Sequence, residues 1–270
     1  MITFLFDLDG VIYRDREPVP GAADTIAAFR AAGHQILFAT NNATKLRAEF
    51  IERLRDVGVP ATIEELATSA SATAEYLRTL ESPPATALVV GSDALALELT
   101  DAGIRVIDLQ AVPVEQPDCV VASLDRQFTY EKLARAQLAV LGGAMLVATN
   151  RDPQFPGAHG RLWPGAGSIV AAVETASRKT AVAIGKPGPL LYKTLLEATG
   201  ANQKRTIVVG DNLETDIAAA AAMNLPSVLV LTGISQREDI PASAAKPTLV
   251  VDTLTDLLTY DLERLLSSKT

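Results

Sequence analysis

The chain alternates short, strongly apolar runs with longer stretches in which apolar residues recur at the spacing of a helix. Residues 2–6 predict a fully buried strand, and residues 21–32 predict a helix that ends at Gly33. A second strand follows at residues 35–39 and a second helix at residues 45–57. Apolar strands separated by helices are typical of βαβ units. The pattern therefore predicts an α/β fold with a doubly wound, Rossmann-like parallel sheet that is covered on both faces.

Two polar breaks divide this alternating pattern. One is the Glu-Ser-Pro-Pro run at residues 81–84, and the other is the Ser-Arg-Lys-Thr run at residues 177–180. A separate set of strands and helices lies between them, which indicates an inserted α/β domain. We expect a core domain formed by residues 1–80 and 180–270, and an inserted domain formed by residues 81–179.

Charge and cysteine content argue against several classes of protein. The net charge is -8 over 270 residues, and an acidic surface repels phosphate backbones, so we expect no nucleic-acid partner. The single cysteine, Cys119, cannot form a disulfide within the chain, which favours the reducing cytoplasm. No apolar run approaches the roughly 20 residues of a membrane-spanning helix, and the N-terminal run lacks the features of a signal peptide. We expect a cytoplasmic protein that has no membrane partner.

Polar side chains follow the predicted strands, at the edge where sites form in open parallel sheets. The first strand delivers Asp7 and Asp9, and a late strand delivers Asp211, with Asp216 five residues further on. Two carboxylates at about 4 Å repel each other by roughly 4 kcal/mol at an intermediate dielectric, so a cation is expected among them. Oxygen ligands without histidine or cysteine favour a hard ion, most commonly Mg²⁺.

A metal beside a carboxylate favours phosphoryl transfer, which needs an in-line nucleophile and dispersal of charge. Asp7 can attack phosphorus and form an aspartyl phosphate. Asp9 can protonate the leaving oxygen and later activate water. The phosphoryl oxygens can be bound by a hydroxyl, two backbone amides and an ammonium group, those of Thr40, Asn41, Asn42 and Lys186.

These residues resemble the four motifs of the haloacid dehalogenase superfamily of phosphatases. The DxDG motif begins at Asp7, the strand that ends in Thr or Ser ends at Thr40, and the lysine is Lys186. The fourth motif, GDxxxTD, spans residues 210–216. The Asn41-Asn42 pair and the long gap before Lys186 are similar to class IIA, which contains NagD-type, phosphoglycolate, pyridoxal phosphate and 4-nitrophenyl phosphatases.

The resemblance implies a set of roles for the residues of these motifs. The metal is held by the Asp7 carboxylate, the Asp9 backbone carbonyl and Asp211, and Asp216 steadies a water or another ligand around it. It also implies an α/β cap between the second and third motifs, and pairing of two chains through their caps. The substrate is a small phosphorylated metabolite whose identity stays open. A cap loop would select it, and our candidates for contacting it are Asp125, Arg126 and His159.

Two other functions share part of this pattern. A phosphomutase could use the same core motifs, although the resemblance of the cap argues for hydrolysis. A receiver-like module, which is phosphorylated on an aspartate and signals, also has an acidic metal site and a lysine on a parallel sheet. Such a module lacks the acid/base aspartate two residues after the nucleophile, and it carries no inserted cap.

Overall fold

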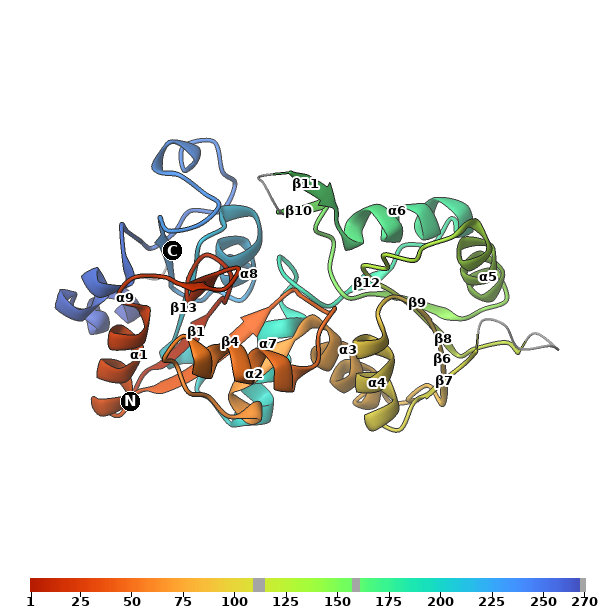
Figure 1. Cartoon of the computed structure of the whole chain (residues 1–270), viewed down its shortest axis with the longest axis horizontal. Coiled ribbons are helices and arrows are strands. Elements are labelled where there is room, and N and C mark those ends of the chain that lie inside the picture. Colours follow the sequence, from red (N-terminus) through yellow and green to blue (C-terminus); the bar gives the residue numbers. More distant parts are fainter. Residues whose placement is uncertain (109–114, 157–160, 268–270) are drawn as a thin grey trace. The chain divides into compact units, whose positions relative to one another are not determined.

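Two parallel sheets organise the chain in the computed structural model, which describes residues 1–108, 115–156 and 161–267 (Figure 1). Each sheet belongs to its own compact unit. The first unit comprises residues 1–40, 47–67 and 186–270, and the second comprises residues 41–46 and 68–185. We describe the units separately.

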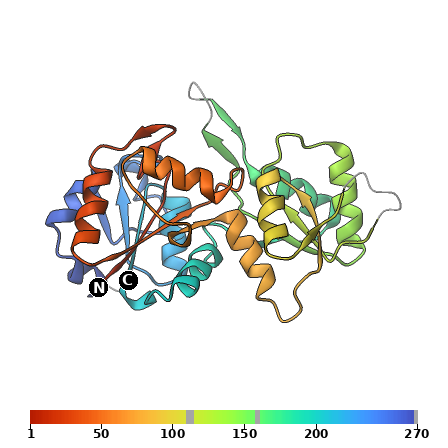
Figure 2. The ribbon, with the colours of Figure 1, turned by 60° about the horizontal axis from the view of Figure 1, so that its bottom comes forward.

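The first unit contains a six-stranded sheet in the order β15-β14-β13-β1-β4-β5. Its central strands are buried along their whole length, because helices flank the strands on two sides (Figure 2). This confirms the predicted doubly wound sheet. The strands are β1 (Thr3–Phe6), β4 (Gln35–Thr40), β5 (Leu66–Thr68), β13 (Thr206–Gly210), β14 (Ser227–Val230) and β15 (Leu249–Val251), with a small hairpin formed by β2 (Tyr13–Arg14) and β3 (Glu17–Pro18).

The helices of this unit lie mainly between the strands, as the sequence predicted. The α-helices are α1 (Ala22–Ala31), α2 (Arg47–Asp56), α7 (Leu190–Thr199), α8 (Ala218–Ala222) and α9 (Leu262–Ser267). Shorter turns are the 3-10 helices η1 (Ile63–Glu65), η3 (Gln203–Arg205), η5 (Arg237–Asp239) and η6 (Leu254–Thr259), and the π-helical turn η4 (Leu213–Ile217).

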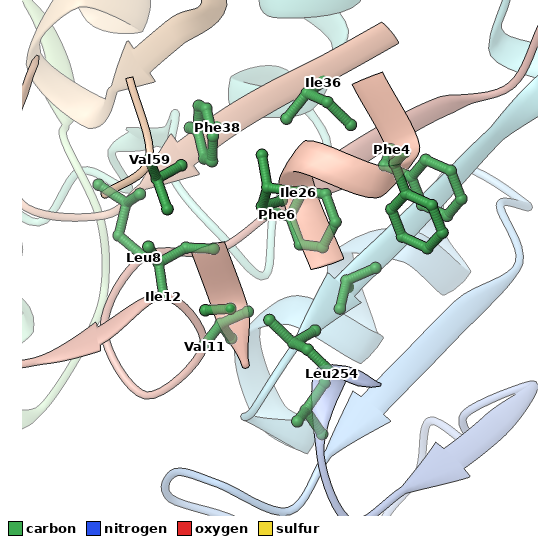
Figure 3. Close-up of a cluster of buried hydrophobic side chains, with 14 of the residues drawn as sticks. Phe4, Phe6, Leu8, Val11, Ile12, Ile26, Ile36, Phe38, Val59 and Leu254 are labelled. Atoms are coloured by element: carbon green, nitrogen blue, oxygen red, sulfur yellow. The ribbon is translucent and has the colours of Figure 1, made fainter. Parts of the chain in front are cut away.

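Aromatic side chains from β1, β4 and α1 form the centre of the core of this unit. Phe4 stacks on Phe29 with ring centroids 4.2 Å apart, and Phe6 packs beside Phe38 on the neighbouring strand. Figure 3 shows these strand residues together with Ile26 and Leu254. The same apolar cluster includes side chains of β4 and β13, the two strands that pair with β1. This packing holds β1 between its neighbours and so fixes the position of the residues that follow β1.

The sheet reverses its direction of winding at β1. The chain passes from β1 to β4 on one side, and the later strand β13 pairs with the other side of β1 in parallel register. Ligands of open α/β sheets bind beyond the carboxyl ends of strands at such a switch point. The residues after β1 and β13 therefore occupy the place in this sheet where a site is expected.

The second unit has a five-stranded parallel sheet in the order β12-β9-β8-β6-β7 and a hairpin of β10 with β11. Strand β8 and helices α5 and α6 enclose an apolar core of their own. This is the inserted α/β domain that the sequence predicted. Its elements are α3 (Ser69–Arg78), β6 (Thr86–Val90), α4 (Asp93–Asp101), β7 (Arg105–Val106), β8 (Cys119–Ala122), α5 (Tyr130–Leu141), β9 (Met145–Ala148), β10 (Gln154–Pro156), β11 (Leu162–Pro164), α6 (Ala166–Ser177) and β12 (Val182–Ala183).

The division between the units differs from the expected positions near residues 80 and 180. Residues 41–46 group with the inserted unit, and the main part of that unit begins at Thr68 and ends at Gly185. Helix α3 groups with the inserted unit because it packs on α4. The sequence pattern did not predict this helix, and it placed the first break at the more conspicuous proline pair that follows it.

Among the described residues, no helix is both long enough and apolar enough to cross a bilayer.

Candidate active site

Neighbouring strands of the first unit deliver Asp7, Thr40 and Asp211 to one edge of the sheet. Asp7 follows β1 and donates its backbone N–H to the Val209 carbonyl of β13. Thr40 ends β4, and Asp211 follows β13. All three side chains are buried. The predicted convergence of strand ends is therefore present within one unit.

Lys186 lies among the carboxylates at this edge. Its ammonium group, on a side chain that is 3% exposed, pairs with the Asp7 carboxylate and donates to Asp216 at 2.7 Å. It also donates to the Ala39 carbonyl on β4 at 3.3 Å. The lysine thus connects Asp7 after β1, Ala39 on β4 and Asp216 after β13.

Asp216 is held on both of its carboxylate oxygens. Tyr192 on α7 donates its hydroxyl to Oδ1 at 3.3 Å, beside the bond from Lys186, and the Asn212 backbone amide donates to Oδ2 at 3.2 Å. These bonds favour a supporting role for Asp216 over direct binding of a metal. The sequence pattern did not identify Tyr192. Its only signal is its place on the buried face of α7, beside Leu191 and Leu195.

Asp211 is enclosed by backbone. Its Oδ2 accepts from the Ile234 amide at 2.7 Å, and its carbonyl accepts from the Ser235 amide at 3.0 Å. A Cβ at either Gly10 or Gly233 would overlap the Asp211 carboxylate. Residues 233–235 follow β14, and the sequence pattern did not connect them with the site.

The buried acids are electrostatically coupled. One oxygen of each of Asp7, Asp211 and Asp216 lies within 4.8 Å of the others. Burial raises the pKa of Asp7 well above its usual value, although Lys186 lowers it, and it raises the pKa of Asp211 to about 7, with Asp216 adding to the rise. Burial opposes charge on Lys186, but Asp216 and Asp7 outweigh it and raise the lysine pKa. One cation thus stands among three acids.

Asp9 lies two residues after Asp7, in the turn that leads to the β2–β3 hairpin. Its side chain is exposed, and its backbone forms an isolated bridge with Tyr13. An exposed carboxyl group can exchange protons with solvent, which suits an acid/base residue. The role of Asp9 stays a prediction.

Asn41 and Asn42 begin the second unit. The Asn41 carboxamide donates to the Asp152 carboxylate at 3.1 Å. The backbone carbonyl of Asn41 accepts from the Ser69 hydroxyl at 2.6 Å. The Asn42 side-chain oxygen accepts from the Thr44 amide and hydroxyl at 2.9 and 2.7 Å. The predicted phosphate-binding role of this pair therefore rests on its backbone amides and not on its side chains.

The three cap candidates differ in their surroundings. Asp125 is buried, accepts from the Gln127 amide at 2.8 Å and pairs with Lys132 at 2.6 Å, so its carboxylate anchors the loop that carries Arg126. Arg126 is exposed and lies over the Phe155 ring at 5.8 Å. His159 lies outside the described residues. Arg126 therefore remains the candidate whose charged group is presented at the surface of the inserted unit.

The fold and this edge define an α/β enzyme built for phosphoryl transfer, and comparison with known proteins agrees. Residues 4–105 match a family model described as haloacid dehalogenase-like hydrolase, and residues 183–257 match one described as HAD-hydrolase-like. Human glycerol-3-phosphate phosphatase is 36% identical, over 95% of this chain and 89% of the relative. Acid sugar phosphatase from Staphylococcus saprophyticus is 35% identical, over 94% and 96% of the two chains.

Solved structures give the same result. A glycerol phosphate phosphatase from Mycobacterium tuberculosis, in complex with magnesium, superposes with a TM-score of 0.86 at 36% identity. The match covers 97% of this chain and 78% of that chain. The chain belongs to the haloacid dehalogenase-like hydrolases, and it is a phosphatase of that family. These relatives are phosphatases, which favours hydrolysis over the phosphomutase alternative, and the inserted unit argues against a receiver-like module.

Proposed function

We propose that this phosphatase hydrolyses a small phosphorylated metabolite through a phosphorylated Asp7, with Mg²⁺ as its cofactor. One observation carries the proposal: Asp7 is buried at the switch point of the sheet, paired with Lys186 and close to Asp211. An acid in this position is held next to a cation that can attract a phosphate group. The roles of the individual residues are part of the proposal.

The residues present fit Mg²⁺. The donors are carboxylates and a backbone carbonyl, which are the ligands a hard divalent ion prefers. Asp7 and Asp211 are buried with raised pKa values, so a cation among them would relieve their mutual repulsion. Asp7, the Asp9 carbonyl and Asp211 would hold the ion. When bound, Mg²⁺ supplies positive charge to the phosphoryl oxygens.

The chain's own residues divide the reaction into two steps. An Asp7 oxygen attacks phosphorus, the bond from phosphorus to the ester oxygen breaks, and Asp9 gives that oxygen a proton. Asp9, now ionised, takes a proton from water as the water attacks phosphorus, and inorganic phosphate leaves Asp7. Lys186 and the Thr40 hydroxyl bind the phosphoryl oxygens in both steps.

The inserted unit would select the leaving group and exclude bulk water from the site. Glycerol-3-phosphate and sugar phosphates are the substrates named for the relatives described above. Both are small polyhydroxylated esters, so they head the panel of substrates to be tested. Arg126 is the residue we propose to contact the substrate, through a carboxylate or a second phosphate.

Phosphate release with Mg²⁺, beside an EDTA control, tests the proposed function. We expect turnover of p-nitrophenyl phosphate and of at least one of glycerol phosphate, sugar phosphate, phosphoglycolate and pyridoxal phosphate, and none in EDTA. We expect Arg126→Ala to change kcat/KM unequally across these esters, because it removes a contact that only some of them make. A wild type inactive on the whole panel would refute the function, and an unchanged profile would remove Arg126 from specificity.

The raised pKa values predict how Mg²⁺ stabilises the protein at different pH. In the metal-free folded state Asp7 and Asp211 retain protons above the usual carboxyl pKa of about 4, and Asp211 loses its proton near pH 7. The folded state then binds more protons than the unfolded state, so its stability falls as pH rises through this window. Mg²⁺ needs the ionised carboxylates and should stabilise the protein more at pH 8 than at pH 5.

Thermal melts in Mg²⁺ and in EDTA at both pH values check this prediction. At a Mg²⁺ concentration about 100 times its Kd, stabilisation by binding is about 2.7 kcal/mol. Asp211→Asn should reduce the difference between the two pH values. An equal Mg²⁺ effect at pH 5 and pH 8 would contradict the assignment of the buried acids to the metal.

Two further proposals concern the setting in which the enzyme works. We place it in the cytoplasm because it has one cysteine, Cys119, and cell fractionation tests this. We propose that two copies pair through the inserted unit, where the large apolar side chains of Tyr130, Leu138 and Leu141 are exposed on α5. Light scattering that gives the mass of a single chain would exclude the pairing.

A further inference from the structure

The segment that follows β14, residues 231–235, contacts the two loops that carry Asp7 and Asp211. The Thr232 hydroxyl donates to the Gly10 carbonyl at 2.6 Å, three residues after Asp7. The next residues, Gly233 to Ser235, enclose Asp211 through the close backbone approach of Gly233 and the amides of Ile234 and Ser235. All of these residues lie in the first unit.

The backbone carbonyl of the same threonine also accepts hydrogen bonds. Arg14 in the β2–β3 hairpin donates its Nε to the Thr232 carbonyl at 2.6 Å, and a second guanidinium nitrogen reaches the same oxygen. Arg53 lies over the Tyr13 ring at 5.6 Å in this hairpin. The hydroxyl and the carbonyl of Thr232 are therefore both used to bind the nucleophile loop and its hairpin.

The Asp211 carboxylate lies between two backbone segments that leave it no spare room. Gly10 has a φ of +82°, and a Cβ there would overlap the carboxylate, as would one at Gly233. The carboxylate is thus held in place by how closely these segments approach each other. Thr232 joins the two segments directly, through the hydrogen bond from its hydroxyl to Gly10.

We propose that Thr232 is a positioning residue of this phosphatase: it joins the Asp7–Gly10 turn to the segment that encloses Asp211, and so sets the spacing of the two metal-binding aspartates. This inference deepens the proposed function and rests on it for the identity of the metal. Thr232 acts through Gly10 and Asp211 and needs no contact with substrate. Its loss should therefore weaken Mg²⁺ binding before it changes binding of the phosphate ester.

The test compares Thr232→Val, which removes only the hydroxyl, with Thr232→Ser, which keeps it. Thr206→Val is the matched control, because the Thr206 hydroxyl also donates to a loop carbonyl, that of Asn202, at 2.9 Å, but lies at the opposite end of β13. The full-length proteins are titrated with Mg²⁺ alone by calorimetry. Urea unfolding in EDTA measures any general loss of stability.

Groups that orient metal ligands typically contribute 10- to 100-fold in affinity, so we expect Thr232→Val to raise the Kd for Mg²⁺ about 10-fold. Thr232→Ser should restore most of that affinity, and Thr206→Val should leave the Kd unchanged. In turnover, excess Mg²⁺ should recover much of the Thr232→Val rate, with little change in KM for the ester. Because calorimetry needs no substrate, this result is independent of whether the proposed ester chemistry holds.

Three results would overturn the inference. The first is a Thr232→Val protein that binds Mg²⁺ as tightly as the wild type. The second is a serine variant that fails to restore affinity, which would show that the hydroxyl is not responsible. The third is a Thr206→Val protein with an equal loss of affinity, which would show that the effect is a general loosening of the unit.

Discussion

Asp7→Asn should abolish turnover, with kcat/KM for p-nitrophenyl phosphate falling on the order of 10⁴-fold or more. The amide keeps the size of the side chain and cannot attack phosphorus to form the aspartyl phosphate. Any residual rate would come from the phosphate-binding groups and from water alone. The assay is phosphate release under saturating Mg²⁺, compared with the wild type in EDTA.

A matched control shows that the lost activity does not come from lost folding. In Asp7→Asn the buried Lys186 keeps Asp216 as its partner, so the metal-free variant should remain folded, at a lower urea midpoint than the wild type because one acid of the pair is lost. Exchanging the exposed Asp15 for Asn in the nearby turn should leave the rate unchanged. A folded Asp7→Asn protein that retains a tenth or more of wild-type activity would contradict the role of Asp7 as nucleophile.

Lys186→Met should reduce both activity and stability. The Lys186 ammonium group is the cation that pairs with Asp7 and Asp216, and the lysine side chain is only 3% exposed. Removing a charged donor from a phosphoryl site typically lowers kcat by about 10²–10³-fold. Removing one partner of a buried ion pair costs about 3–5 kcal/mol of unfolding free energy, because the remaining charge is left without compensation.

The loss of stability should depend on pH. Lys186 lowers the pKa values of Asp7 and Asp211, so its removal should raise both and make their ionisation in the folded state more costly. The destabilisation should therefore be largest at pH 8, above the wild-type Asp211 pKa of about 7. At pH 5, below that value, Asp211 keeps its proton, and the loss should be smaller. Urea unfolding in EDTA at the two pH values measures the difference. The exposed Lys193, paired with Glu197 at 3.9 Å on α7, offers a control: Lys193→Met should change stability little at either pH.

An equal loss of stability for Lys186→Met at pH 5 and pH 8 would indicate that packing of the lysine stem, rather than its charge, holds the site together. Retained activity would show that another group neutralises the phosphate.

Much of the fold could be predicted from local sequence pattern. The buried strand β1 lies in the largely apolar run that predicted a strand at residues 2–6, and helix α1 (Ala22–Ala31) lies within the predicted range 21–32. The strand ends were also informative. Because parallel strands place their carboxyl ends at one edge of a sheet, Asp7 and Asp211 were expected to lie close together if their strands were neighbours. The structure supplies that condition, because β1 pairs with β13.

The parts that were not predicted depend on contacts between distant segments. Helix α3 groups with the inserted unit through its packing on α4, which its own residues do not reveal. Tyr192 donates to Asp216, which lies 24 residues further along the chain, and its local pattern is that of an ordinary buried helix face. Thr232 lies more than 200 residues after Gly10, so their hydrogen bond has no local signal in the sequence.

The most direct test of the central claim is to trap the phosphoryl group on Asp7 in an Asp9→Asn variant supplied with p-nitrophenyl phosphate and Mg²⁺. Nitrophenolate leaves without needing a proton, so the first step should proceed, while the second step lacks the base that activates water. We expect a burst of about one equivalent of nitrophenolate per chain, followed by a stall, with the phosphoryl group found on Asp7 after acid quench and peptide mapping. Continued wild-type release without a trapped phosphoryl group, or phosphorylation of another residue, would contradict the role of Asp7 as the nucleophile.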